Sequence, residues 1–187
     1  MFKKSVANLN NVRYLAIMAI FIVIKVDMAS LFIPVGENLR ISFTFLVIAV
    51  ESCIIGPIPA LASGFITDII GFMLFPFGAF FPGYILSAML NCFIYAVFLY
   101  DTRITIAKLF ASKFIVTYFC NVLLGSLWSS MLYSKGFMFY VTASFIKNTI
   151  LFPIEVILLV IVFKLILPLL QKKNLVPKQD SNKIPLI

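Results

Sequence analysis

Long apolar segments are the feature that most restricts the fold of this 187-residue chain. A helix that crosses a lipid bilayer needs about 20 mostly apolar residues. Six segments approach this length, and loops with proline, glycine or charged residues separate them. They cover roughly residues 12–33, 41–55, 58–75, 80–100, 104–133 and 139–170. The sequence therefore predicts an all-α integral membrane protein with six transmembrane helices in a single domain.

The composition excludes several classes of function. Hydrophobic residues make up 63% of the chain and charged residues only 12%, whereas a soluble domain is about half apolar and a quarter charged. A soluble globular enzyme is therefore excluded. The chain has no histidine, so triads, metal sites, haem sites and proton relays that need histidine are excluded as well. It also contains no phosphate-binding loop for ATP hydrolysis, and we expect no metal and no catalytic residue.

The distribution of lysine and arginine predicts the orientation in the membrane. With six spans, eleven of these residues lie on the side of the two termini and four on the other side. The positive-inside rule then places both termini in the cytoplasm. The net charge of +8 is explained in the same way, and we expect no nucleic-acid partner. Residues 171–187 are expected to form a polar, mostly disordered cytoplasmic tail.

Cations in or beside the apolar segments are candidates for anion binding. Arg40 precedes the second segment, and Lys147 with Asn148 lies in the sixth. Charge within a membrane is costly and usually faces a cavity or a partner. Together these residues can form an anion site in the outer half of the bundle. The alternative is that the long side chains only reach for the lipid headgroups.

Among the carboxylates, Asp68 is the candidate for ligand recognition. It lies in the third apolar segment, more than halfway towards the outer face. A carboxylate there can accept two N–H donors from a heterocycle, or it can pair with a neighbouring helix. Glu51 and Glu155 lie deeper, where they could pair with Lys113 or with polar side chains. We expect them to be structural or coupling residues more often than ligand contacts.

Residues 72–84, between the third and fourth segments, are rich in aromatic side chains. Five phenylalanines and one tyrosine lie there beside two prolines and two glycines. Proline and glycine fix a turn, and aromatic rings offer flat surfaces for stacking. This pattern fits a lid over a planar ligand, and it also fits the aromatic belt at a membrane interface.

Several of these motifs occur together in one known family. The chain resembles the substrate-binding S components of energy-coupling factor (ECF) vitamin transporters, and most closely the folate-specific ones. The motifs that carry the resemblance are Leu39-Arg40-Ile41-Ser42-Phe43, Gly56-Pro57 followed by Ala60, Gly64 and Asp68, then Phe81-Pro82-Gly83-Tyr84, Lys147-Asn148 and Pro153-Ile154-Glu155. Their order and spacing, more than any single motif, make the match specific.

The resemblance implies a six-helix S-component fold in a prokaryotic cell membrane, with an outward-open vitamin pocket under two loops. It implies an importer subunit that captures folate at the outer face and delivers it inward, and not an enzyme. Its partners would be a transmembrane coupling protein and two cytoplasmic ATPases. The partner ATPases would use ATP, and this chain would need no cofactor. Ala16 and Ala19, which share a face of the first helix, would contact the coupling protein.

The resemblance to folate-specific members also suggests a role for each candidate site residue. Asp68 would receive the N–H donors of the pterin, and cations would pair with the carboxylates of the glutamate tail. Aromatic side chains would stack on the rings. The expected substrate-binding residues are Lys25, Arg40, Asp68, Phe77, Phe80, Phe81, Gly83, Tyr84, Trp128, Lys147 and Asn148.

Two alternatives remain at this point. The first is an S component for another vitamin, such as thiamine, riboflavin or pantothenate. A cationic ligand such as thiamine would favour acidic and aromatic residues over the outward cations Arg40, Lys135 and Lys147. The second is a membrane assembly protein without a transport role, which would bind no small molecule.

Overall fold

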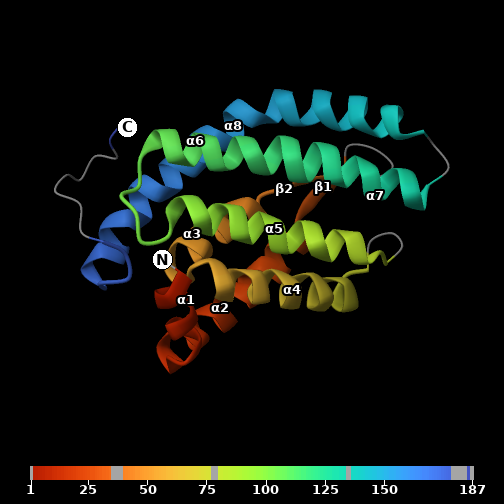
Figure 1. Cartoon of the computed structure of the whole chain (residues 1–187). Helices are drawn as coiled ribbons and strands as arrows, with labels where there is room; N and C mark the ends of the chain where they lie inside the picture. Colours follow the sequence, from red (N-terminus) through yellow and green to blue (C-terminus); the bar gives the residue numbers. More distant parts are fainter. Residues whose placement is uncertain (1, 35–39, 77–79, 134–135, 178–184, 186–187) are drawn as a thin grey trace.

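Figure 1 shows a bundle of helices in a computed structural model of the chain. The structure describes residues 2–34, 40–76, 80–133, 136–177 and 185. Its helices are α1 (Phe2–Leu9), α2 (Val12–Ser30), α3 (Thr44–Ile55), α4 (Pro57–Leu74), α5 (Pro82–Leu99), α6 (Ile106–Ile115), η1 (Val116–Leu124), α7 (Gly125–Leu132) and α8 (Phe137–Lys172). Two short strands, β1 (Phe32–Pro34) and β2 (Arg40–Ser42), form an antiparallel pair.

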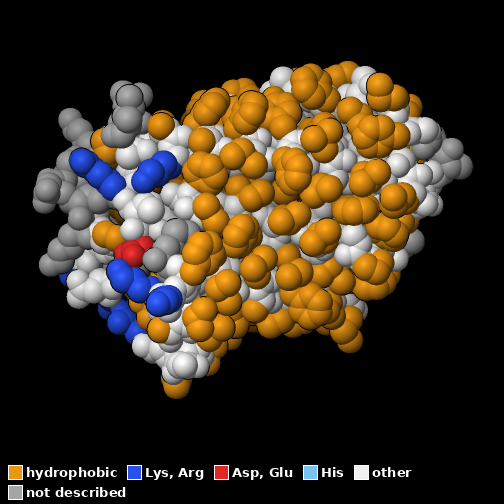
Figure 2. Space-filling view, viewed as in Figure 1, with side chains coloured by type: hydrophobic (Ala, Val, Ile, Leu, Met, Phe, Trp, Pro, Cys, Tyr) orange, Lys and Arg blue, Asp and Glu red, His pale blue; other side chains and the backbone are white. Residues whose placement is uncertain are grey.

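The helices are built for a lipid environment. Among the described residues, four helical stretches are long and apolar enough to cross a membrane: α4, α5, the continuous run α6–η1–α7, and α8. Helix α3 has only 12 residues, and α2 carries three charged residues. Hydrophobic side chains cover the length of the bundle in Figure 2, whereas lysines and arginines gather at one end. A helical membrane architecture is thus found, with the short β1–β2 pair as its exception among the described residues, and the number of six spans stays a prediction.

Prolines and one glycine define where the central helices begin. Pro57 and Pro82 occupy the first turns of α4 and α5, where a missing backbone N–H does no harm. Gly56 joins α3 to α4 with a φ of +86°, a conformation that side chains other than glycine rarely adopt. Helices α4 and α5 therefore begin and end within about two residues of the third and fourth apolar segments predicted from the sequence.

The hairpin formed by β1 and β2 was not predicted from the sequence. We expected the first helix to continue to residue 33 and the second to begin at residue 41. Instead, Ile33 pairs with Ile41 across the two strands. Pro34 explains part of this difference, because the residue before a proline disfavours the helical conformation. The apolar pattern alone did not distinguish a strand from a helix end here.

Helix α1 was not expected, and its side chains cap other helices. Ser5 is fully buried, and its Oγ accepts a hydrogen bond from the backbone N–H of Ile58 in the first turn of α4. Asn8 Nδ2 donates to the carbonyl of Ile55 and to the hydroxyl of Tyr100, each at 3.0 Å. Helix ends leave backbone groups without partners, and α1 supplies partners for α3 and α4 at their junction.

The described ends of the chain lie at the same end of the bundle, as Figure 1 shows for α1 and the last turns of α8. The guanidinium of Arg13 donates to the carbonyl of Lys173. Helix α8 extends to Lys172, and Val176 beyond it is buried. The region expected to be a disordered tail therefore begins with packed residues, because an apolar side chain in it reaches the core.

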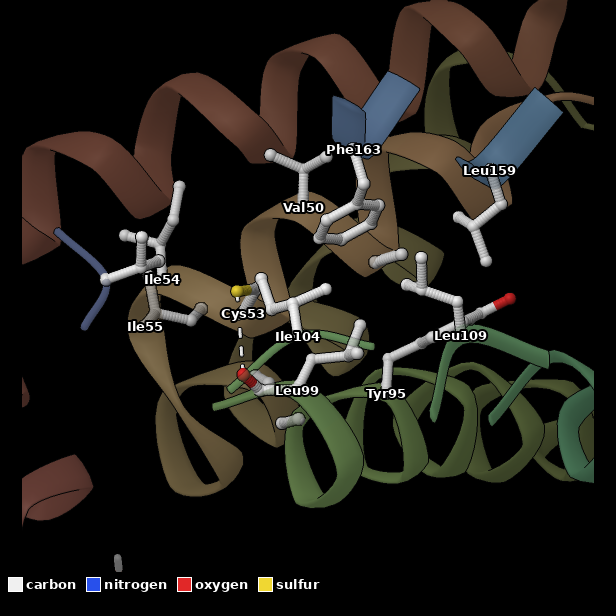
Figure 3. Packing of buried hydrophobic residues seen from close by; sticks show 14 of the residues in the cluster. Val50, Cys53, Ile54, Ile55, Tyr95, Leu99, Ile104, Leu109, Leu159 and Phe163 are labelled. Atoms are coloured by element: carbon white, nitrogen blue, oxygen red, sulfur yellow. Dashed lines mark hydrogen bonds between the residues drawn. The ribbon is translucent and has the colours of Figure 1, made fainter. Parts of the chain in front are cut away.

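The core occupies the end of the bundle near α1. Figure 3 shows its centre, where side chains from α3, α5, α6 and α8 meet. Helices α4 and α5 approach closely, since a Cβ at Gly64 would lie 3.0 Å from the carbonyl oxygen of Ala88. Tyr95, a member of the core cluster, has no exposed surface. The core ends at this residue, and a cavity begins on its other side.

Candidate functional site

A cavity of about 420 Å³ lies among α3, α4, α5, the α6–η1–α7 helix and α8. Ligand sites for small molecules usually have volumes of about 300–1,000 Å³. The cavity extends from Phe75 and Phe80, at the facing ends of α4 and α5, to Tyr95 at the edge of the core. In Figure 1 these facing helix ends lie at the opposite end of the bundle from α1.

Residues spaced three or four apart line the cavity from three helices. On α5 the stripe consists of Tyr84, Ser87, Ala88, Asn91 and Tyr95. On α8 it consists of Tyr140, Ser144, Lys147, Asn148, Leu151 and Glu155. This spacing places side chains on one helix face, and at the usual helical rise the α5 stripe is roughly 16 Å long. The cavity therefore suits an elongated ligand.

The third stripe runs through the π-helical segment η1. Val116, Cys120 and Asn121 of this segment line the cavity, between Lys113 of α6 and Gly125 of α7. A π-helical turn is wider than an α-helical turn, and such segments often occur at functional sites. Two adjacent residues of this segment, Cys120 and Asn121, line the cavity.

Aromatic side chains surround the mouth of the cavity. Phe80, Phe81 and Tyr84 all line it. The ring of Phe81 lies 5.6 Å from that of Trp128 and 6.3 Å from that of Tyr84, measured between centroids. The indole N–H of Trp128 donates to Ser87 Oγ at 2.9 Å, which fixes the tryptophan behind this cluster. The aromatic segment of the sequence thus borders the cavity.

Gly83 permits this packing. A Cβ at this position would lie 2.5 Å from Phe81 Cε1 and 2.5 Å from Trp128 Cδ2. Gly83 and Trp128 do not line the cavity themselves, but they hold Phe81, which does. Their contribution to a site is therefore the position of an aromatic ring.

The structure brings together polar residues that are far apart in the sequence. Asp68 from α4 lines the same cavity as Lys147 and Asn148 from α8. The amide of Asn148 donates to the backbone carbonyl of Ser144, one turn earlier on α8, at 2.8 Å. A carboxylate, an ammonium group and an amide thus lie around one space, where they can recognise a ligand with both N–H donors and anionic groups.

Lys25 lies elsewhere. Its side chain has no exposed surface, and its Nζ lies 2.6 Å from Glu51 Oε2 and 2.7 Å from Ser63 Oγ. It is not among the residues that line the cavity. In this structure Lys25 is therefore a partner of α3 and α4, and the expected contact of Lys25 with a ligand has no support here.

The structure gives less information about the remaining residues that the sequence predicts for ligand or partner binding. The backbone of Arg40 belongs to β2, opposite Pro34, but its side chain lies outside the described part of the structure. Phe77 also lies outside the described residues. Ala16 and Ala19 are exposed on α2, as a contact with another protein requires.

The deep end of the cavity contains polar residues that the sequence reasoning did not assign to ligand binding. Lys113 Nζ lies 3.0 Å from Glu155 Oε2, which is one of the pairings that the sequence allowed for Glu155. The ammonium group also lies 3.6 Å from the centre of the Phe45 ring. Asn91 and Tyr95 of α5 lie at the same end. The sequence could have identified Asn91 and Tyr95 as lining residues from their spacing to Tyr84, because all three fall on one helical face.

Comparisons with known proteins identify relatives of this chain. Models of known protein families give no match. The chain is 29% identical over 153 residues to a protein of Clostridium novyi called folate transporter FolT, covering 82% of this chain and 87% of that protein. It is 32% identical over 132 residues to a folate transporter FolT of Leuconostoc mesenteroides, covering 66% of this chain and 71% of that protein.

A solved structure agrees with these relatives. The crystal structure of a FolT protein bound with folic acid matches with a TM-score of 0.74 and 31% identity, covering 80% of this chain and 91% of that chain. The relatives are transporters, and the apolar helices found here are those of a multi-pass protein of a prokaryotic cell membrane. The chain is therefore a transport protein and belongs to the FolT family, the folate-specific S components of ECF transporters.

Proposed function

We propose that this protein binds folate at the outer face of the membrane and passes it inward as the S component of an ECF importer. The observation that carries the proposal is the long cavity, which combines aromatic rings at its mouth with Asp68 and Lys147 on its walls. The names of the relatives and the folic acid in the similar crystal structure support the choice of ligand.

The chemistry of folate fits this lining. Folate has a flat pterin with N–H donors, an aromatic ring in the middle and a glutamate tail with two carboxylates. Phe80, Phe81 and Tyr84 offer rings for stacking, and Lys147 offers a positive charge for the tail. Arg40, in the adjacent hairpin, is the second proposed cation.

The transport step requires partners. We propose that the exposed face of α2 around Ala16 and Ala19 contacts a transmembrane coupling protein, because small residues allow helices to approach closely in lipid. Two cytoplasmic ATPases would bind and hydrolyse ATP, and this chain would carry no cofactor of its own. The basic end of the bundle (Figure 2) would face the cytoplasm, as the positive-inside rule requires.

Thermal unfolding of the detergent-purified chain with a panel of vitamins tests the ligand. A ligand that binds only the folded state stabilises it by about 2.7 kcal/mol at a concentration of 100 times Kd. We expect a rise in the unfolding midpoint with folates and none with thiamine, riboflavin or pantothenate. A rise with another vitamin alone would reject folate, and no rise with any of them would reject the role as a vitamin binder.

Variants of the cations test the proposed site. Arg40→Met and Lys147→Met should each weaken folate binding, and the unfolding midpoint of each variant without ligand is measured to separate binding from folding. Lys164→Met is the matched control, because Lys164 is an exposed lysine of α8 that does not line the cavity. Unchanged folate affinity in both Arg40→Met and Lys147→Met would show that the proposed anion site is wrong.

A further inference from the structure

The N-terminal helix α1 has three faces of different character. Ser5 is fully buried and accepts a hydrogen bond from the first turn of α4. Phe2 and Val6, four residues apart on one edge of the helix, are 50% and 48% exposed. Lys3 and Lys4 are exposed as well. A short helix that combines an apolar edge with lysines is typical of helices that lie at a membrane surface.

Phe2 continues the lipid-facing surface of α5. Its ring stacks on that of Phe93, with the ring centroids 6.4 Å apart and the ring planes at 26°. Phe93 falls on the same face of α5 as Leu86 and Val97, which are exposed apolar residues of a helix long enough to cross a membrane. Phe93 lies six residues before Leu99, where α5 ends, or roughly 9 Å along the helix axis. The apolar edge of α1 therefore lies at the level where the acyl chains begin.

Contacts between elements bring further cations to the end of the bundle where α1 lies, and Figure 2 shows lysines and arginines gathered there. Lys4 Nζ lies 2.9 Å from Asp101 Oδ2, in the turn that follows α5. The guanidinium of Arg13, at the start of α2, donates to the carbonyl of Lys173 after α8 at 3.0 Å. The cations of this end, which we call the basic rim, are Lys3, Lys4, Arg13, Arg103, Lys108 and Lys173. Among the described residues, Asp101 is the one carboxylate paired with the basic rim, so the rim has a net positive charge.

We propose that α1 lies in the plane of the membrane surface and binds the headgroups of anionic phospholipids with its lysines. The basic rim supplies the complementary charge, while Phe2 and Val6 contact the acyl chains of the same leaflet. The apolar edge of α1 is continuous with the lipid-facing surface of α5, which favours a lipid over a second protein as the partner. This contact is independent of the ligand in the cavity.

Lipid bound to α1 should also stabilise the bundle. Ser5 Oγ accepts from the backbone N–H of Ile58, and Asn8 Nδ2 donates to the carbonyl of Ile55, so α1 caps the junction of α3 and α4 only when it is in place. A partner that binds only the folded state raises the unfolding midpoint. Anionic lipid is therefore expected to raise the unfolding midpoint more than neutral lipid does.

Lipid titration of the full-length chain in detergent tests the proposal. Native mass spectrometry measures the bound lipid, with phosphatidylglycerol as the anionic probe and phosphatidylcholine of the same acyl chains as the neutral one. Lys3→Gln should weaken phosphatidylglycerol binding about fivefold, the usual contribution of one lysine near an anionic surface, and leave phosphatidylcholine binding unchanged. Phe2→Ser should weaken the binding of both lipids. Free inorganic phosphate should not displace the lipid, and displacement would overturn the assignment to a lipid headgroup.

Matched variants separate the position of the charge from its amount. Lys3→Arg keeps the charge and should bind phosphatidylglycerol like the wild type. Lys164→Gln removes one charge from an exposed position of α8, roughly 12 Å along the helix axis before Lys172, and should have little effect. The unfolding midpoint of Lys3→Gln without lipid should equal that of the wild type. Equal binding of both lipids by the wild-type chain, or the same loss in Lys3→Gln and Lys164→Gln, would overturn the proposal.

Discussion

Lys25 and Glu51 form an ion pair inside the bundle, with Nζ 2.6 Å from Oε2 and no exposed surface on either side chain. Ser63 completes the group, because its hydroxyl accepts from Lys25 and donates to Glu51. The three residues come from α2, α3 and α4. Ala29, Ile48 and Thr67, each one helical turn away from a member of this group on its own helix, line the cavity. This triad therefore joins the helices that form one wall of the site.

Breaking the ion pair from one side should destabilise the protein strongly. Lys25→Met leaves the Glu51 carboxylate buried without its cation, and the loss of one partner of a buried pair typically costs about 3–5 kcal/mol. Denaturant titration of the purified chain measures the free energy of unfolding. The variant Lys25→Met/Glu51→Leu should recover most of the loss, because replacing both charges with apolar groups is often neutral. A double variant as unstable as the single one would contradict this account.

Gly64 should not tolerate a side chain. In Gly64→Ala the new Cβ would lie 3.0 Å from the carbonyl oxygen of Ala88 and from Met89 Cα, so α4 and α5 must move apart. Overpacking of this kind costs about 1–3 kcal/mol. Gly71→Ala on the same helix is the control, since nothing lies within 4 Å of its Cβ. We expect a lower unfolding midpoint for the first variant only, and equal midpoints would disprove the close contact.

Gly83→Ala should impair ligand binding more than stability. Its Cβ would meet Phe81 and Trp128 at 2.5 Å, and both are side chains that can shift. The shift would displace Phe81 from the cavity mouth and weaken folate binding about tenfold, or by about 1.4 kcal/mol. Gly136→Ala, with open space around its Cβ, should bind folate like the wild type. Titration with folate compares the two, and wild-type affinity in Gly83→Ala would exclude this role of Phe81.

The N-terminal helix should contribute to stability through Asn8. Asn8→Ala leaves the carbonyl of Ile55 and the hydroxyl of Tyr100 without the donor seen here. A buried polar group without its partner costs about 1–3 kcal/mol, so thermal unfolding should occur at a lower temperature. Asn10→Ala, at an exposed position, should have little effect. If both variants unfold like the wild type, α1 does not cap the α3–α4 junction in solution.

The site was only partly visible in the sequence. Asp68, Lys147 and Asn148 could be found because charged or amide groups in apolar helices usually have a specific partner, and the structure places all three around one cavity. Lys25 satisfied the same criterion and yet pairs with Glu51. The sequence does not show which neighbour a buried charge has, since that depends on how the helices pack.

Tyr95 and Asn91, in contrast, were not identified as site residues from the sequence. Each is an unremarkable residue in an apolar segment, and each becomes informative only when its partner is absent among the described residues. The π-helical segment η1 is similar, because the apolar pattern of residues 104–133 fits a regular helix equally well. Such features depend on contacts between elements, which helical periodicity does not encode.

By itself, the sequence determined that this chain is a helical membrane protein, because apolar segments of this length are stable only where lipid surrounds them. It also determined approximately where α4 and α5 begin, since Pro57 and Pro82 fit well in the first turn of a helix. Only the tertiary structure decided which buried charges pair with each other and which line the cavity. The physical reason is that ion pairing and cavity formation depend on distances between helices, which arise when the helices pack together.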